Sequence, residues 1–494
     1  MTSLTTNRRC TVWSLLSVLG ALLGLLPASP ARAAVPGITG PSFNLVASAD
    51  YTSQPDGASI YSWGYGCDGA PAGFLPLRPA GATGPAPACP ATMQLPGPTL
   101  IVTEGQVVTV TLRNNLPVAA GNTSMVFPGF QVTTGATGVA GLLTQEAANG
   151  GGTVAYTFTA NRPGTHAYYS GTQADLQIEM GLFGALVVLP ATPPATCSKG
   201  QFSLAASAYD HAATCYDREY MFQTSEMDSR IHDRALAQVQ ACPVGPCPVI
   251  AAVTEPYRPN YYLLNGRSMP DDMDTAYAPG YVRQPYNANP HMHPGEKVLM
   301  RMIGQGRWQH PFHFHGNHAR VLARDGNLLV SAVDPAYLAG PLLFTIPTVS
   351  GQTQDQIFTW TGKGLNWDVY NHHAGDGSSC IPDASGYHAT PGSPNLGEWC
   401  ADHLKPIPVT PPDPTIVAIG QWYGGTPYLG IQNSGGFTST NEPPGTLNQN
   451  PQAGYAYMWH SHNEREITTN DVFPGGMLTM LLIDPPTWFI DESL

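Results

Sequence analysis

Residues 104–116 read EGQVVTVTLRNNL, and this stretch shows a pattern that recurs along most of the chain. A run of Val, Thr and Leu between Gln106 and Arg113 is bounded by Gly105 and Asn114, which is typical of a short strand between turns. Comparable runs occur at Pro98–Val102, Gly152–Thr159, Gly184–Leu189, Tyr220–Thr224, Tyr261–Leu264, Glu296–Ile303, Phe312–Ala323, Gln356–Thr361, Ala456–His462 and Met477–Ile483. This series predicts an all-β fold of the sandwich type.

A proline-rich joint at Pro190–Thr196 divides the predicted strands into two series. We therefore expect two domains, at residues 44–190 and 197–486. The second contains a Gly-, Pro- and Asn-rich stretch at about 375–454, which is typical of a long surface insertion. Ser229–Ala241 is the one good helical candidate, because its apolar residues fall on one stripe.

The first residues have the pattern of a secretory signal. Arg8 and Arg9 precede a mostly apolar run at Val12–Leu26, and Ala31–Ala33 offers a small-residue cleavage site. We expect residues 1–33 to be removed and the protein to be exported, to the periplasm or the extracellular space. Stable membrane insertion is not expected, because a spanning helix needs about 20 apolar residues. A twin-arginine signal is the alternative interpretation of Arg8 and Arg9.

The charge balance limits the partners of this protein. The formal net charge is −13, which argues against nucleic acid or an anionic membrane surface as a partner. Only 11% of residues are charged, while there are 53 glycines and 48 prolines. That composition favours many turns and short strands over long helices.

Eight cysteines lie outside the expected signal, at Cys67, Cys89, Cys197, Cys215, Cys242, Cys247, Cys380 and Cys400. An even count in an exported chain favours disulfides. Pairing of sequence neighbours is the simplest arrangement, although eight cysteines allow about 105 connectivities. A thiolate metal site at Cys242 and Cys247 is the alternative.

Two histidine clusters carry the strongest functional signal, HPFHFHG at residues 310–316 and HSH at residues 460–462. Because side chains alternate faces along a strand, His313 and His315 share one face, and His310 lies on the other. By the same argument His460 and His462 share a face, opposite Ser461. Four imidazoles are therefore expected to converge on one metal. Neutral imidazole suits copper, zinc, iron or nickel.

The order of these motifs resembles the multicopper oxidase family, which is built from cupredoxin β-sandwich domains. The matching segments are Pro96–Thr99, Glu104–Leu116, Gly181–Val188, Tyr262–Gly266, Gly295–Arg301 and the two histidine clusters. The resemblance implies two cupredoxin-like Greek-key domains and copper as the cofactor. It also implies a blue-copper role for His310, and it makes His313, His315, His460 and His462 the last domain's half of a trinuclear cluster.

The departures from the family pattern matter as much as the match. Ser461 and Glu466 stand where the family has the cysteine and the second histidine of its blue-copper site. A serine hydroxyl cannot replace a thiolate as a soft copper ligand. The family's first-domain ligand positions also hold other residues in this chain, namely Val126, Pro128, Tyr169 and Gly171. Ordinary laccase turnover is therefore not expected.

We predict an exported copper-binding protein, an oxidoreductase whose single nonstandard copper site uses the four histidines. Zinc is the alternative metal, and His310 is an additional candidate ligand. The alternative functions are a non-catalytic copper-binding or storage protein and a structural relict of the fold.

Around His310, Ser461 and Glu466 the sequence allows either a buried polar network or a harder metal site or acid–base pair, with Glu466 and His310 as the catalytic candidates. It identifies no small-molecule substrate, and it leaves homo-oligomerisation open.

Overall fold

The computed structural model describes residues 35–78, 84–200, 203–363, 369–370, 372, 377–393, 395–404, 421–423, 454–484 and 488–490. The expected signal at residues 1–33 and much of the expected insertion lie outside these residues. Among the helices of the described ranges, we find none that combines the length and the apolar character needed to cross a membrane.

The first series of strands forms two sheets that pack face to face. One has the order β10 (Gly164–Tyr169), β11 (Phe183–Leu189), β5 (Leu100–Thr103), β1 (Gly37–Thr39) and β4 (Phe74–Leu75). The other has the order β3 (Ser59–Cys67), β2 (Ser42–Ser53), β6 (Val107–Asn114) and β9 (Thr153–Thr159). On β6, Val108, Val110 and Leu112 are fully buried and alternate with more exposed residues. This alternation puts one face of β6 into the core between the sheets.

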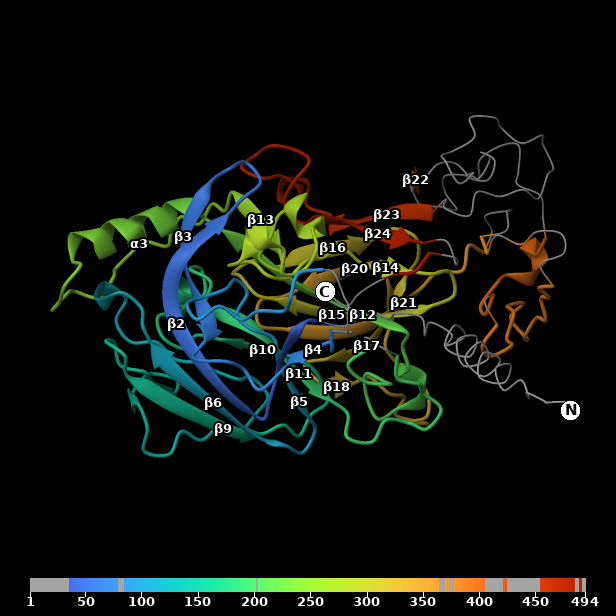
Figure 1. Cartoon of the computed structure of the whole chain (residues 1–494), viewed down its shortest axis with the longest axis horizontal. Coiled ribbons are helices and arrows are strands. Elements are labelled where there is room, and N and C mark those ends of the chain that lie inside the picture. The colour runs from blue at the N-terminus through green and yellow to red at the C-terminus, as the bar shows by residue number, and fades with distance from the viewer. Residues whose placement is uncertain are drawn as a thin grey trace, which may run out of the picture.

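The second series forms another such pair. The larger sheet has the order β13 (Tyr261–Leu264), β12 (Arg218–Met227), β15 (Lys297–Gly304), β21 (Thr353–Thr359), β17 (Ala319–Arg324) and β18 (Asn327–Leu328), with β19 (Leu342–Leu343) beside β17. The smaller has the order β14 (His291–Met292), β24 (Leu478–Ile483), β23 (Gly454–Ser461), β16 (His310–Phe314) and β20 (Thr345–Thr348), with β22 (Gln421–Tyr423) beside β23. Phe222, Phe312 and Trp459 join the two sheets in one aromatic core. The fold is all-β and cupredoxin-like, as the sequence predicted (Figure 1).

Short elements fill the connections. They are β7 (Val139–Ala140), β8 (Gln145–Glu146), α2 (Ala174–Gln177) and the 3-10 turns η1 (Val118–Ala120), η2 (Ala212–Thr214), η3 (Asp271–Met273), η4 (Pro279–Tyr281), η5 (Cys400–Asp402) and η6 (Glu464–Ile467).

The predicted helix is confirmed as α3 (Ser229–Ala241), and it covers the first sandwich although it follows β12 of the second. The side chain of Asp228 accepts a hydrogen bond from the Arg230 backbone N–H and so caps the helix. Ile231 and Ala235 are buried in the core of the first sandwich, beside β3 (Figure 1).

A buried polar network also joins the two sandwiches. Arg301 on β15 donates to Glu219 and, at 3.1 Å, to the Thr165 hydroxyl on β10. Thr165 in turn donates to Asp355 on β21 at 2.6 Å. The guanidinium therefore lies between two carboxylates at the contact of the sandwiches, with its own side chain 1% exposed.

One predicted strand is wrong in its extent. The run Phe312–Ala323 is split between β16 and β17, which belong to different sheets. Gly316 lies in the turn between them with φ +98°, a conformation that favours glycine. A Cβ at this position would also lie 3.2 Å from the Tyr457 ring.

The predicted pairing of sequence neighbours is confirmed for all eight cysteines of the described residues. The disulfides are Cys67–Cys89, Cys197–Cys215, Cys242–Cys247 and Cys380–Cys400. The alternative of a thiolate metal site at Cys242 and Cys247 is therefore wrong, because a disulfide sulfur is not a thiolate.

Candidate metal centre

The two histidine clusters meet on neighbouring strands of the smaller sheet. β16 and β23 are antiparallel, and His313 lies directly opposite His460. Ring centroids are 4.9 Å apart for His313 and His315, 4.9 Å for His313 and His462, and 5.2 Å for His315 and His460. The structure therefore brings together the four histidines that the face argument grouped.

The surroundings favour the neutral form of two imidazoles in this cluster, His313 and His460. Burial, followed by the neighbouring rings of His315, His460 and His462, lowers the pKa of His313 to about 4. Burial also lowers the pKa of His460. Neutral imidazole is the form that binds a metal ion.

Hydrogen bonds fix two of the rings. The Nδ1 atom of His313 lies 2.7 Å from the Thr345 hydroxyl, and Nδ1 of His460 lies 2.7 Å from the Ser461 carbonyl oxygen. Such contacts set the ring orientation and the tautomer of a ligating histidine. His462 is exposed, so the cluster is open to solvent at one corner.

The distances between the imidazole nitrogens are the next feature of the cluster. Nε2 of His460 and Nε2 of His315 face each other at 3.3 Å. Two neutral nitrogen acceptors at this distance repel unless a proton or a cation lies between them. In the described residues, two groups of three side chains each have their ligand atoms within 4.8 Å of one another. Both groups lie elsewhere, and no three of the four histidines form such a group. The chemistry of the four donors, all imidazole nitrogens, fits copper or zinc.

The opposite face of β16 carries a different arrangement around His310. Its Nδ1 lies 2.9 Å from Glu466 and its Nε2 lies 2.9 Å from Glu226. Ser461 donates to the same oxygen of Glu466 at 2.5 Å, and Asn463 donates to the other at 2.8 Å. The structure therefore places His310, Ser461 and Glu466 together, on the side of the strand away from the four histidines.

The two neighbouring carboxylates determine the protonation state of His310. Burial lowers its pKa, but the hydrogen bonds and charges of Glu226 and Glu466 outweigh burial and raise that pKa to about 9. At neutral pH the ring is thus an imidazolium that donates from both nitrogens. Neither ring nitrogen is available to the four-histidine cluster.

Glu226 is the residue of this network that sequence reasoning missed. It lies near the end of β12, 84 residues before His310, and its backbone neighbours are all buried. Its carboxylate also accepts the backbone N–H groups of Arg307 at 2.6 Å and Trp308 at 2.9 Å. A glutamate within a fully buried strand is the only sequence signal, and it names no partner.

Comparison with known proteins identifies the first sandwich. Residues 83–193 match the family model described as multicopper oxidase. This segment is a multicopper oxidase domain. At the expected ligand positions of that family this chain carries other residues, namely Val126, Pro128, Tyr169 and Gly171. No protein of curated function matches the sequence.

Several solved structures resemble the multicopper oxidase-like chain over most of its length. The multicopper oxidase mgLAC has 16% identity and TM-score 0.46, with 93% of this chain and 89% of that chain covered. A blue copper oxidase from Nitrosomonas europaea has 15% identity and TM-score 0.45, with 91% and 85% covered. A copper nitrite reductase from the same organism has 14% identity and TM-score 0.45, with 92% and 98% covered.

The multicopper oxidase domain itself offers no metal ligands at the positions where the resemblance expects them. Val126 forms a backbone bridge with Tyr169, and a Cβ on Gly171 would lie 2.8 Å from Val126. These positions therefore do lie together, but they present no imidazole. His166, the nearest histidine in sequence, is buried with Nε2 3.0 Å from the Arg162 carbonyl oxygen.

Proposed function

We propose that this protein is an exported, copper-binding, multicopper oxidase-like oxidoreductase with one mononuclear centre held by His313, His315, His460 and His462. The observation that carries the proposal is the packing of four imidazoles across β16 and β23, with ring centroids 4.9 to 5.6 Å apart. Three imidazoles with an open position permit redox or Lewis-acid chemistry.

The chain's own residues would prepare this centre in two ways. Thr345 and the Ser461 carbonyl oxygen orient the rings of His313 and His460, while the low pKa of His313 keeps it unprotonated well below neutral pH. The exposed His462 leaves a side from which a small molecule could reach the ion. A copper ion, when bound, would supply one-electron exchange.

Copper analysis of the purified exported protein, combined with paramagnetic resonance, tests the proposal. We expect one Cu²⁺ per chain at this centre, without intense blue absorption. His313→Ala and His460→Ala should each weaken copper binding at least tenfold. His318→Ala is the matched control, because His318 lies near the cluster, is exposed and packs on Phe344. Three or more coppers in the cluster, an intense blue band, or copper binding unaffected by both substitutions would refute this function.

A non-catalytic copper-binding role is the second candidate, and one observation favours it. All eight cysteines of the described chain are in disulfides, so none supplies the thiolate through which a laccase receives electrons. Oxygen uptake by the copper-loaded protein in the presence of ascorbate separates the two. Turnover that His313→Ala abolishes supports the oxidoreductase, and stable copper binding without turnover supports the storage role.

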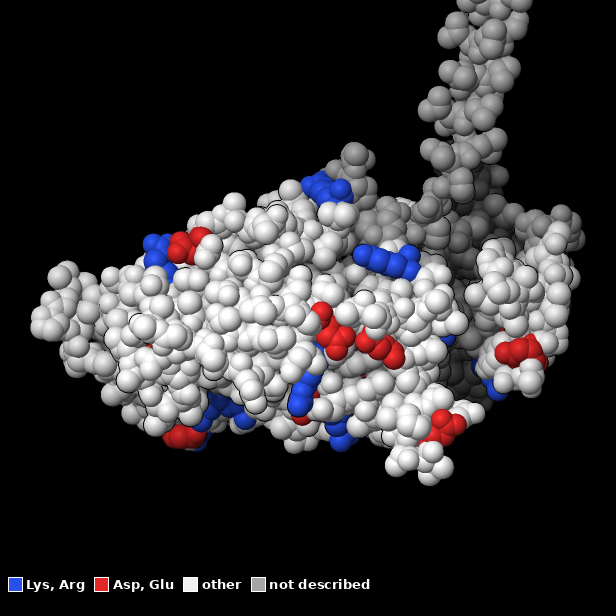
Figure 2. Space-filling model, turned by 90° about the horizontal axis from the view of Figure 1, so that it is seen from below, with Lys and Arg blue, Asp and Glu red and all other residues white. Residues whose placement is uncertain are grey.

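We further propose export to the periplasm or extracellular space. Four disulfides support an oxidising compartment. Charged side chains are few and of mixed sign on the face shown in Figure 2, which supports a small-molecule rather than a nucleic-acid partner. Fractionation of cells that express the full chain, followed by mass determination of the N-terminus, tests the export and the cleavage near residue 33.

A further inference from the structure

A second group of metal-type ligands lies between the two histidine clusters in the sequence, with His372 just before the expected insertion and Glu398 and His403 within it. Nδ1 of His372 is 3.1 Å from Oε1 of Glu398, and Nδ1 of His403 is 2.9 Å from the same oxygen. The two imidazole rings are 4.4 Å apart. One ligand atom from each of the three residues lies within 4.8 Å of the others.

Burial distinguishes this trio from an ordinary surface ion pair. His372 is 4% exposed and Glu398 is 2% exposed, and His403 is partly exposed. Both imidazoles contact the same carboxylate, and a divalent cation bound among the three groups would take the place of the protons that they share. The partial exposure of His403 leaves one side on which water could complete the coordination.

The Glu398 carboxylate is fixed by a hydrogen bond from a neighbouring side chain. Asn395 donates from Nδ2 to Oε2 of Glu398 at 2.6 Å and to the Ser379 carbonyl oxygen at 2.8 Å. Oε2 thus accepts from an amide and also lies 3.1 Å from Nδ1 of His403, while Oε1 faces both imidazoles. Hydrogen bonding of a ligand carboxylate by a neighbouring side chain is typical of metal sites.

The surrounding loop is pinned at several points. The Cys380–Cys400 disulfide anchors the segment between Glu398 and His403. A Cβ on Gly295, next to the start of β15, would lie 2.3 Å from the Leu396 carbonyl oxygen, so the loop packs directly on the second sandwich. Glu398 and His403 therefore extend from a constrained backbone.

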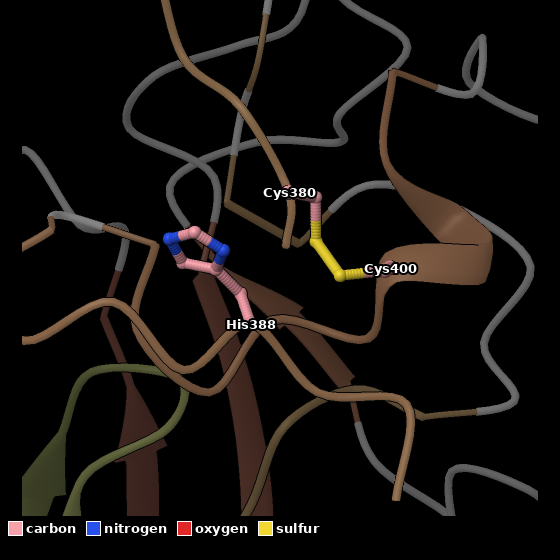
Figure 3. Close-up of side chains that lie close together, drawn as sticks. All are labelled: Cys380, His388 and Cys400. Atoms are coloured by element: carbon pink, nitrogen blue, oxygen red, sulfur yellow. A yellow bond between two sulfur atoms is a disulfide. The ribbon is translucent and has the colours of Figure 1, made fainter. Parts of the chain in front are cut away.

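A neighbouring trio in the same loop is not a metal site, because two of its members form a disulfide. Cys380, His388 and Cys400 also lie close together, but Figure 3 shows the two sulfur atoms bonded to each other. Nδ1 of His388 accepts the Ile381 backbone N–H at 2.7 Å, so this ring has a structural role. His388 consequently serves as a control within the same loop.

We propose that His372, Glu398 and His403 form a separate site for a divalent transition-metal ion of the zinc class, which fastens this loop to the second sandwich. Two neutral imidazoles, one carboxylate and a water make a common zinc coordination set. The ion joins His372 to Glu398 and His403, so its binding energy adds to the stability of the folded loop.

Cobalt titration of the full chain tests the proposal separately from the four-histidine centre. The background is His313→Ala/His460→Ala, stripped with a chelator, so that the first centre is disabled. We expect one Co²⁺ per chain, visible d–d absorption, displacement by Zn²⁺, and a Zn²⁺-dependent rise in the melting temperature.

In that background Glu398→Gln and His403→Gln should each weaken Co²⁺ binding at least tenfold and remove the Zn²⁺-dependent rise in melting temperature. His388→Gln should leave the affinity within about twofold. Circular dichroism of the metal-free variants verifies folding. If Glu398→Gln does not fold, His403→Gln still tests the site, because His403 is partly exposed. Absence of Co²⁺ and Zn²⁺ binding in the background protein, or equal affinity in Glu398→Gln, His403→Gln and the background, would overturn the proposal. Neither result depends on whether the four-histidine centre binds copper.

Discussion

Replacing Glu466 with Gln removes one of the two negative charges beside His310 and keeps the size of the side chain. In the wild type, the folded-state pKa of His310 is about 9 and its ordinary value is 6.5. The folded protein therefore holds this proton more tightly than the unfolded chain does. The resulting stabilisation is fully present below pH 6.5 and is lost as the pH rises through about 9.

The size of this effect follows from the two pKa values. At about 1.4 kcal/mol for each pH unit between 6.5 and 9, His310 contributes about 3 kcal/mol to the free energy of unfolding. Burial still disfavours the charged ring in the variant, so losing one of the two carboxylates should remove more than half of that pH-dependent loss of stability.

Guanidinium unfolding of the metal-free, disulfide-intact protein at pH 6.5, 8 and 9 measures the effect. Burial raises the pKa of Glu179 to about 8, so this group also makes stability fall with pH, but mainly below pH 8 and in both proteins. The comparison above pH 8 therefore reports chiefly on His310. Glu464→Gln is the matched control, because Glu464 is exposed in the same turn η6. Equal pH slopes in Glu466→Gln, Glu464→Gln and the wild type would refute a charged His310.

Three further substitutions test other parts of the structure. Arg301→Ala leaves two buried carboxylates without their cation at the contact of the sandwiches, and should cost about 3–5 kcal/mol in guanidinium unfolding. Gly266→Ala should lower the melting temperature far more than Gly57→Ala; both glycines have φ near +85°, but only at Gly266 would a Cβ meet a carbonyl oxygen at 2.2 Å. Ser461→Cys with added Cu²⁺ should develop no intense blue absorption, because both ring nitrogens of His310 are held by carboxylates. A blue band would show that His310 can leave these carboxylates and bind copper.

The local features of the fold could be predicted from the sequence because they depend on local periodicity. The stripe at Ser229–Ala241 gave the bounds of α3, and alternation along β16 separated His310 from His313. The split of Phe312–Ala323 was not predictable in this way, because β16 and β17 both carry buried apolar residues and only a short turn at Gly316 separates them. Sequence patterns report which residues face a core, and they do not report which sheet supplies it.

The residues of the candidate sites that the sequence did not identify come together through long-range contacts. Glu226 could not be assigned to His310, because any buried carboxylate needs a partner and the sequence alone does not say which one. His372, Glu398 and His403 lie in a stretch without regular periodicity, where no face argument applies. Their proximity depends on how the loop is pinned, and the Cys380–Cys400 disulfide and the packing on Gly295 provide that information only in three dimensions.

The hydrogen bonds around His310 explain why the changes at residues 461 and 466 belong together. A thiolate-bound metal would bring positive charge to this pocket, and the structure instead contains a protonated imidazole between two carboxylates. Ser461 donates to the same oxygen of Glu466 that His310 contacts, so the hydroxyl supports the carboxylate. Replacing Ser461 with Cys alone would remove that support without freeing His310. The charge of the pocket is thus balanced by side chains, which leaves the other face of β16 as the face where a bound ion would find neutral ligands.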